Sequence, residues 1–136
     1  MQHLEKILDA HPDPAHADGA VALACIRACF DCSATCATCA DACLAEDDVA
    51  GMVHCVRLNL DCVDVCDVTG RLIARPSARD ANTLREQLEA CVAACRACGD
   101  ECAKHGQHGV EHCRVCAHAC QACAKACEEM AGALVA

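Results

Sequence analysis

The chain has 136 residues, the size of one ordinary domain, and we predict a single domain over 1–136. Eighteen residues are cysteines and Phe30 is the only aromatic residue, so cysteine, alanine, valine and leucine have to fill the core. The net charge of −9 disfavours nucleic acids and anionic membranes as partners, because both recruit clustered Lys and Arg.

The N-terminal sequence predicts a cytoplasmic protein. Residues 1–19 contain no basic start followed by an apolar run, so they do not have the form of a secretion signal. We find no stretch that approaches the roughly 18 uninterrupted apolar residues of a membrane-spanning helix, and we expect no membrane span. A reducing cytosol keeps thiols free, and we therefore expect thiols rather than disulfides.

The N-terminal segment 1–17 predicts a short helix. Leu4, Ile7 and Leu8 recur on one helical face, and Pro12 follows them closely, so the helix has to end before that proline. We expect this segment to act as a cap that covers one end of the fold.

The first long helix is predicted over 18–46, with Asp18 as its N-cap. Its cysteines recur at alternating steps of four and three residues, which places them in a heptad seam along one helix face. This seam contains Cys25, Cys29, Cys32, Cys36, Cys39 and Cys43. A second helix over 48–74 continues the same phase with only three cysteines. Its seam contains Met52, Cys55, Asn59, Cys62, Cys66 and Thr69.

Two more helices with the same phase follow a turn at Pro76. The third is predicted over 78–105, and its seam contains Leu84, Leu88, Cys91, Cys95, Cys98, Cys102 and His105. Gly106 and Gly109 indicate the next turn. The fourth helix is predicted over 110–133, and its seam contains Cys113, Cys116, Cys120, Cys123, Cys127 and Met130.

These elements predict an all-α fold. Short connections force consecutive helices to run antiparallel, so the four long helices should form an antiparallel four-helix bundle with the short N-terminal helix attached. Every cysteine lies on a seam, and the seams face the bundle axis. The cysteines should therefore line the core as a tube of thiols about 30 Å long.

Packing and disulfides are the simplest uses for such thiols, and neither explains the pattern. Buried cysteine can act as a small hydrophobic residue, but eighteen oxidisable thiols are a poor choice if only volume is needed. Side chains at i and i+4 on a helix have Cβ atoms about 5–6 Å apart, whereas a disulfide needs about 3.8 Å. Intrahelical disulfides would be strained, and a reducing compartment disfavours those between helices.

Copper(I) is the metal that the pattern favours. Zinc is usually held by CxxC turns that bend around the ion, whereas these cysteines lie within continuous helices. Iron–sulfur clusters likewise prefer cysteines in loops, and the Glu-x-x-His pairs of a di-iron bundle are missing. Copper(I) is soft and accepts two or three thiolates. We therefore predict many copper(I) ions in the core, with about one monovalent cation per thiolate pair and shared sulfurs, and with protons released on loading.

The two ends of the bundle should differ. One end collects Met52, His54, His105, His108 and His112, with His108 and His112 one turn apart, and we expect copper(I) to enter there. The other end should be sealed by apolar side chains and by the N-terminal segment. These side chains are Leu72, Ile73, Leu84, Leu88, Met130 and Leu134.

The cysteine motifs resemble those of the bacterial copper storage proteins, in particular the cytosolic branch. The motifs run from Cys25 to Cys43, from Cys91 to Cys102 and from Cys113 to Cys127, and the resemblance covers 18–133. It implies a four-helix bundle, a homotetramer and many copper(I) ions held mainly by pairs of thiolates. By this resemblance all eighteen cysteines are ligands, with His and Met near the open mouth. A copper chaperone is then a candidate source of the ions.

Two other functions stay open. One is a zinc or general metal buffer of the metallothionein type, which the helical position of the cysteines disfavours. The other is a thiol redox protein, which needs one or two activated thiolates. No cysteine stands out from the other seventeen by sequence. We expect no enzymatic activity, because the sequence has no Gly-rich phosphate loop and no evident pair of nucleophile and base.

Overall fold

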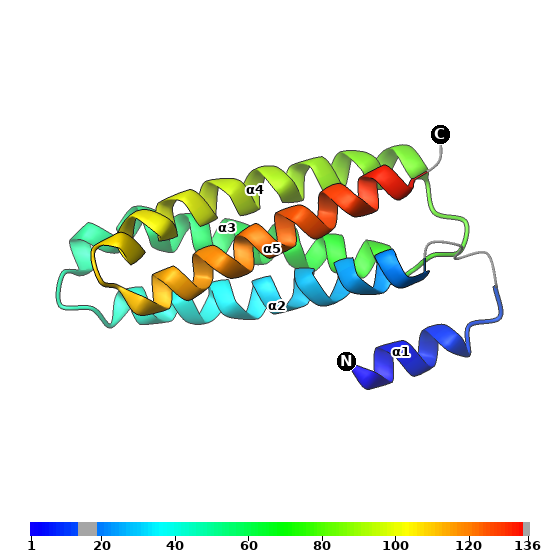
Figure 1. Ribbon diagram of the computed structural model, residues 1–136, viewed down its shortest axis with the longest axis horizontal. Coiled ribbons are helices and arrows are strands. Elements are labelled where there is room, and N and C mark those ends of the chain that lie inside the picture. The colour runs from blue at the N-terminus through cyan, green and yellow to red at the C-terminus, as the bar shows by residue number, and fades with distance from the viewer. Residues whose placement is uncertain (14–18, 135–136) are drawn as a thin grey trace.

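A computed structural model describes residues 1–13 and 19–134, which form five α-helices and no strand (Figure 1). The predicted all-α class is therefore confirmed. The helices are α1 (Gln2–Asp9), α2 (Gly19–Leu44), α3 (Val49–Ile73), α4 (Ala81–Gln107) and α5 (Glu111–Ala133).

The four long helices form the predicted antiparallel bundle. α2 packs against α3 and α5, and α4 packs against the same two helices, so the four helices surround one common axis (Figure 1). The connections 45–48 and 108–110 meet at one end, which we call the mouth. The connection 74–80 and the C-terminus lie at the other, which we call the closed end.

Aspartate side chains set the starts of two helices. The Asp48 carboxylate accepts a hydrogen bond from the Gly51 amide at 3.1 Å, and that of Asp80 accepts one from the Thr83 amide at 2.9 Å. Such caps satisfy backbone donors that have no partner within the helix. The prediction that the third helix begins at 78 is wrong, because Asp80 caps a helix that begins three residues later. Ala78 has a φ of 53°, which lies outside the helical region. The predicted N-cap Asp18 lies outside the described residues.

The helix ends at the mouth also differ from prediction. α2 ends at Leu44 rather than at 46, and α4 continues to Gln107 rather than stopping at 105. Gly109 has a φ of 89°, a conformation that a side chain would strain, and this allows the tight turn into α5. A Cβ atom on Gly106 would lie 3.0 Å from the backbone of Arg114, so glycine lets the two helices approach closely.

The core consists mainly of thiols. All eighteen cysteines are buried and free, and none is exposed by more than 2%. This confirms that the heptad seams face the bundle axis. At the closed end the tube stops at apolar side chains, because Ile73, Leu84, Leu88 and Met130 are buried there. Leu72 and Leu134 are partly buried and pack against the same cluster.

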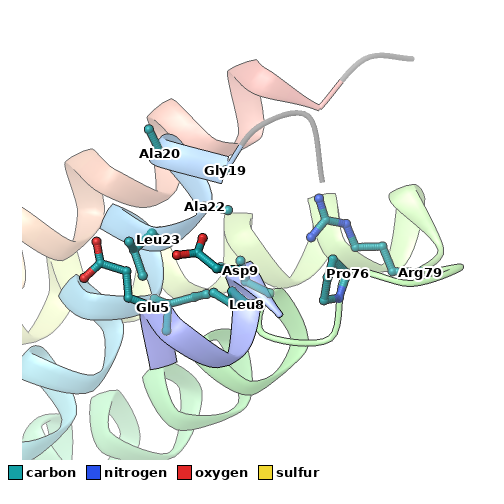
Figure 2. Close-up of a pocket in the computed structure, with 11 residues that line it drawn as sticks. Glu5, Leu8, Asp9, Gly19, Ala20, Ala22, Leu23, Pro76 and Arg79 are labelled. Carbon is teal, nitrogen blue, oxygen red and sulfur yellow. The ribbon is translucent and has the colours of Figure 1, made fainter. Parts of the chain in front are cut away.

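Helix α1 covers the side of the closed end and does not stack across the bundle axis, contrary to the expected cap (Figure 1). Leu4 and Leu8 pack against the core, and Glu5 forms an ion pair of 2.7 Å with Arg27 of α2. A cavity of about 390 Å³ remains between α1 and the bundle, bounded by Leu8 and by Leu23 of α2 (Figure 2). None of the residues of α1 is buried, so only one side of this helix contacts the bundle.

Helix α2 is long and apolar enough to cross a membrane by length and composition alone, and it is the only helix in the described ranges that meets this criterion. Its apolar character comes largely from alanine and cysteine. In the structure its cysteine face is buried between α3 and α5. Core helices of globular bundles meet the same criterion, so this property is weak evidence for a membrane span.

Candidate metal centre

The sulfur atoms of the core lie close to one another over the whole tube. Each of the eighteen Sγ atoms lies 3.6–4.0 Å from the Sγ of at least one other cysteine. Contacts within a helix and between helices have the same length. Cys32 lies 3.8 Å from Cys36 on the same helix and 3.8 Å from Cys62 of α3. A small soft ion therefore has two or three sulfur neighbours at most points along the axis.

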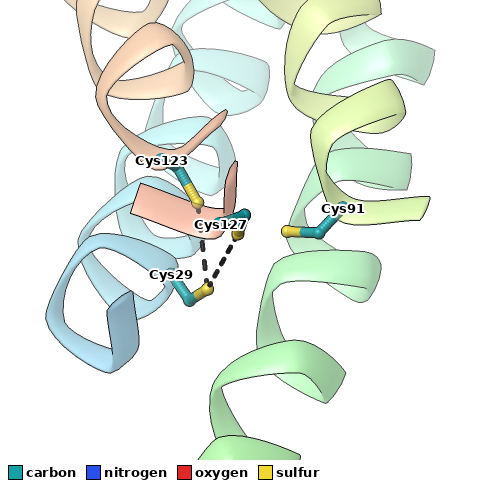
Figure 3. Close-up of side chains that lie close together, drawn as sticks. All are labelled: Cys29, Cys91, Cys123 and Cys127. Atoms are coloured by element: carbon teal, nitrogen blue, oxygen red, sulfur yellow. Dashed lines mark hydrogen bonds between the residues drawn. The ribbon is translucent and has the colours of Figure 1, made fainter. Parts of the chain in front are cut away.

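Several groups of four thiols could each surround one ion. In each of the four groups described here, the sulfur atoms lie within 4.8 Å of one another and come from three helices. Figure 3 shows one group, in which Cys29 of α2 faces Cys123 and Cys127 of α5, with Cys91 of α4 opposite. The other three groups share members. They are Cys32, Cys62, Cys66 and Cys95; Cys32, Cys36, Cys62 and Cys120; and Cys36, Cys98, Cys116 and Cys120.

Asn59 interrupts the thiol tube and hydrogen-bonds to four of its members. Its Oδ1 accepts hydrogen bonds from the thiols of Cys98 and Cys116, both at 3.1 Å, and a longer one from Cys102 at 3.8 Å. Its Nδ2 donates to Cys55 at 3.6 Å. The seam position predicted that Asn59 faces the tube, and its complete burial confirms this. The candidate ligands predicted from sequence did not include it, although its position among the cysteines was the available signal.

Sulfur–sulfur contacts of 4.0 Å or less group the thiols into two sets, which adjoin at Cys55. Fifteen are linked by sulfur–sulfur contacts into one set, the core network. The core network comprises Cys25, Cys29, Cys32, Cys36, Cys55, Cys62, Cys66, Cys91, Cys95, Cys98, Cys102, Cys116, Cys120, Cys123 and Cys127. The mouth group comprises Cys39, Cys43 and Cys113 together with His112.

His112 brings an imidazole into the mouth group. Its Nδ1 lies 3.4 Å from the sulfur of Cys39 and 3.7 Å from that of Cys113, and its Nε2 lies 2.9 Å from a carboxylate oxygen of Glu46. Cys39 and Cys113 therefore differ from the other cysteines in that they contact a histidine. Sequence could not indicate this contact, since packing of α2 against α5 creates it.

The other predicted entry residues lie near the mouth without hydrogen-bonding to a thiol in the described structure. His105 is partly buried, with its Nε2 3.2 Å from a carboxylate oxygen of Glu101. The Nδ1 of His108 donates to the backbone carbonyl of Lys104 at 2.8 Å.

The remaining two residues of this end differ in burial, because Met52 is buried in the core cluster and His54 is exposed. His108 is the residue that follows α4, whereas His112 is on α5. The two histidines, predicted to stand one turn apart, are thus separated by the turn between the two helices.

Burial keeps the mouth thiols protonated in the absence of metal. Desolvation and, after it, the negative charge of the neighbouring Cys55 raise the pKa of Cys43 to about 11. The pKa of Cys113 is raised for the same reasons. An ion that binds these thiols has to displace protons, so loading is coupled to proton release.

Comparison with known proteins shows the family. The family model described as copper storage protein matches residues 20–132. The structure of the Streptomyces lividans copper storage protein Ccsp loaded with 10 copper equivalents superposes with a TM-score of 0.92 and 43% identity, over 96% of this chain and 99% of that chain.

Two further structures are similar. One shows five coppers in the cytosolic copper storage protein of Streptomyces lividans, with a TM-score of 0.82, 46% identity and coverage of 85% of this chain and 95% of that chain. The other is the Cu(I)-bound copper storage protein BsCsp3 of Bacillus subtilis, with a TM-score of 0.71, 36% identity and coverage of 82% and 98%. With its cysteine-lined bundle and a family match over most of its length, the chain belongs to the copper storage protein family.

Proposed function

We propose that this protein stores copper(I) ions as thiolate complexes inside the bundle. The observation that carries this proposal is the continuous set of buried free thiols, each within 4.0 Å of another, in a chain whose relatives bind several coppers. Copper(I) prefers soft thiolate ligands and accepts low coordination numbers, which such a tube offers at many positions. The role is sequestration, which keeps a reactive ion away from other cellular thiols. No catalytic step is part of the proposal.

The charge of the loaded core favours a monovalent ion. A buried thiolate is costly unless a neighbouring charge compensates it. One copper(I) for each thiolate leaves a core of eighteen cysteines close to neutral. One Zn²⁺ with four thiolates instead leaves two negative charges at each site, and these charges would be buried in the bundle. Copper(I) can therefore fill the tube at a much smaller electrostatic cost.

We assign the ligands from the same geometry. All eighteen cysteines of the core network and the mouth group serve as ligands. Ions enter at the mouth, where His112 contacts two thiols and Met52 is buried beside the thiol tube. His105 and His108 take part by accepting incoming ions at the surface, since both lie at the end of α4. This assignment needs small rotations of these two side chains away from Glu101 and Lys104.

The protein acts in the cytoplasm as a homotetramer, with a copper chaperone as the source of ions. A relative that is 46% identical is a cytosolic copper storage protein, which supports the location. A row of apolar side chains on α3 supports self-association. Val49, Val53 and Leu60 are 38%, 42% and 50% exposed, and they recur at helical spacing on one face. A second copy of the chain would cover this row.

Zinc binding is a second candidate that the groups of four thiols favour. A tetrahedral site with zinc–sulfur bonds of about 2.3 Å places its sulfurs about 3.8 Å apart, which is close to the spacing in the metal-free core. The groups share members such as Cys32 and Cys36, so they cannot all be filled at once. A zinc buffer would therefore hold only a few ions, whereas a copper store holds many.

An anaerobic titration distinguishes the two candidates. The reduced protein is titrated with copper(I) against a calibrated chelator, and separately with Zn²⁺, while circular dichroism follows the helix content. Binding of well over ten copper(I) ions per chain, with unchanged helix content, is the expected result. Saturation at a few ions, or copper(I) binding that is weaker than zinc binding, would contradict copper storage.

A further inference from the structure

The cavity of about 390 Å³ at the closed end lies between α1 and the bundle, and no cysteine lines it (Figure 2). Ile26 of α2 and Ile73 of α3 form its floor, and each is only 1% exposed. Leu8 of α1 and Leu23 of α2 form two of its walls. Protein interiors are close-packed and leave few voids larger than a water molecule. A space of this size at the edge of the core therefore holds either water or a ligand.

The apolar lining of the cavity disfavours water as its occupant. A buried water needs about two to four polar partners, whereas the side chains of Ile26, Ile73, Leu8 and Leu23 offer only hydrocarbon. An enclosed apolar cavity of about 150 Å³ is large enough to bind benzene, so this larger space has room for an apolar chain of several carbons. Sites for small molecules have this form, with apolar walls and a few polar groups that fix the orientation of the ligand.

The polar groups at the rim of the cavity include two carboxylates. Those of Glu5 and Asp9 project from α1 toward α2, and both side chains are exposed (Figure 2). Glu5 already forms an ion pair of 2.7 Å with Arg27. Within residues 1–13 and 19–134, the Asp9 carboxylate forms neither an ion pair nor a hydrogen bond, so its charge is available to a ligand. The guanidinium of Arg79 lies at the rim too, which makes an anionic ligand the alternative to be tested.

We propose that this cavity binds a small amphipathic amine, with its apolar chain against Ile26 and Ile73 and its ammonium group on the carboxylate of Asp9. The chain and the cavity walls both lose apolar surface to water, which favours binding. Two carboxylates at the rim, in a chain with a net charge of −9, favour a cation over an anion. The occupant also adds contacts between the bundle and α1, a helix of which no residue is buried.

This site is separate from copper storage. The cavity lies at the closed end and no cysteine lines it, so amine binding needs no metal. A failure of copper storage would leave the amine site unaffected, and a failure of amine binding would leave copper storage unaffected. The two can therefore be tested independently on the same chain.

The three isoleucines of the chain make the site directly observable. Ile26 and Ile73 line the cavity, whereas Ile7 of α1 is 66% exposed and does not line it. The full chain, reduced and metal-free, is labelled at its isoleucine methyl groups and titrated with n-octylammonium below the concentration at which this amine forms micelles. NMR should show a saturable shift of the Ile26 and Ile73 signals and a much smaller shift of the Ile7 signal. No saturable shift at millimolar amine, or equal shifts of all three signals, overturns the proposal.

Two related probes separate the contributions of the head group and the chain. n-Octanoate has the same apolar chain with the opposite charge and should bind at least about threefold more weakly. Ethylammonium lacks most of the chain and should leave the Ile26 and Ile73 signals in place. Octanoate that binds as tightly as octylammonium, or ethylammonium that shifts both signals equally well, overturns the proposal.

Replacement of Asp9 tests the carboxylate. Asp9→Asn should weaken the binding of octylammonium about threefold, the effect of losing one exposed ion pair. The matched control is Asp31→Asn, which removes an exposed carboxylate of α2 that does not line the cavity and should leave the affinity unchanged. Equal affinities of the two variants would overturn the assignment of the ammonium group to Asp9.

Filling the cavity tests its location. Leu8→Trp places a large side chain in the cavity, and the bundle should stay folded because α1 contributes no buried residue. This variant should abolish the shifts of the Ile26 and Ile73 signals. The matched control is Ile7→Trp, which adds the same side chain at an exposed position of α1 and should leave the shifts intact. Shifts that persist in Leu8→Trp overturn the proposal. If that variant has lost helix content, Leu23→Phe fills the cavity from α2 and decides by the same measurement.

Discussion

The core network and the mouth group use the same side chain in two different environments. In the core network, fifteen thiols contact mainly one another, and Asn59 is their polar neighbour. In the mouth group, three thiols share their environment with His112, which in turn contacts Glu46. A regular heptad seam thus provides capacity in the middle of the bundle. The irregular residues at a helix end instead place an imidazole and a carboxylate beside the thiols.

The two ends of the tube show the same contrast in another form. At the closed end, the seam positions beyond the thiol tube carry Thr69, Leu88 and Met130, all fully buried. Thr69 satisfies its hydroxyl locally by donating to the carbonyl of Val65 and accepting from Gln87. No titratable group is needed there. This apolar closed end supports the proposal that ions enter at the mouth, where histidines lie instead of apolar side chains.

Copper loading should have the largest effect on stability. It should also remove the difference between the core network and the mouth group. Ions that bind the folded chain and not the unfolded chain stabilise it, and thiolate sites contribute strongly. We expect the fully loaded protein to exceed the metal-free protein by more than about 10 kcal/mol in the free energy of unfolding. Anaerobic guanidinium unfolding measures this difference. Removal of copper by a strong chelator should restore the metal-free midpoint, and equal midpoints in both states would place the ions outside the core.

Alkaline pH should destabilise the metal-free protein through the mouth group. Burial raises the pKa of Cys43 from its ordinary value of 9.0 to about 11. Below pH 9 the thiol is protonated in both folded and unfolded chains, so its contribution is fully present. As the pH rises from 9 to 11 the unfolded chain ionises first, and up to about 2 kcal/mol of stability is lost.

Unfolding of the metal-free protein at pH 8 and at pH 10.5 measures this loss. Cys43→Ser is the control, since a serine hydroxyl does not ionise in this range, and its dependence on pH should be smaller than that of the wild type. A stability that rises between these two pH values would contradict the assignment of burial as the dominant cause.

Replacement of Asn59 tests what holds the core network together before copper binds. Asn59→Leu removes the acceptor for Cys98 and Cys116 and should destabilise the metal-free protein by about 1–3 kcal/mol. Asn59→Cys places a thiol at this seam position, so it should destabilise the protein less than Asn59→Leu does and should add copper capacity. Asn82→Ala at an exposed position of α4 is the control and should change stability by less than about 0.5 kcal/mol. Equal stability of Asn59→Leu and the wild type would show that the thiols need no polar partner.

Much of the fold could be predicted from the sequence, because the spacing of the cysteines carries the helical period. That spacing predicted four helices and the burial of every thiol, including the seam position of Asn59, and the short connections predicted their antiparallel packing. The start of α4 was missed by three residues, since the connection after Pro76 continues to Asp80, whose side chain caps the helix by accepting from the Thr83 amide. Helix α1 was placed at the end of the axis because the sequence gives no direction for a short helix that precedes the bundle.

The mouth could be predicted only in part. Sequence indicated which histidines lie near this end, but not which of them faces the thiols. His112 and Glu46 are 66 residues apart in the chain, and the packing of α5 against the end of α2 brings them together. Neither heptad phase nor motif carries that information. Chemistry that depends on a single contact between elements therefore has to be read from the structure.

Substitution of His105 should have the smallest effect on stability. It tests a histidine that lies near the mouth but does not belong to the mouth group. His105 lies 3.2 Å from Glu101, and the Lys104 ammonium also lies 3.6 Å from that carboxylate. In His105→Gln the amide can still donate to Glu101, so we expect a change in stability below about 0.5 kcal/mol. His112→Gln removes the imidazole that contacts Cys39 and should lower the free energy of unfolding by more, about 1–2 kcal/mol.

Copper uptake then shows whether His105 has a function beyond this contact. If it accepts ions at the surface, His105→Gln should slow the binding of the first copper(I) ions while leaving the metal-free stability and the final capacity unchanged. Stopped-flow mixing with a copper(I) chelate measures the rate, and His118→Gln is the control. An unchanged rate would limit the entry site to the residues that touch thiols, because a side chain held by Glu101 would then be too far from the ion's path to assist it.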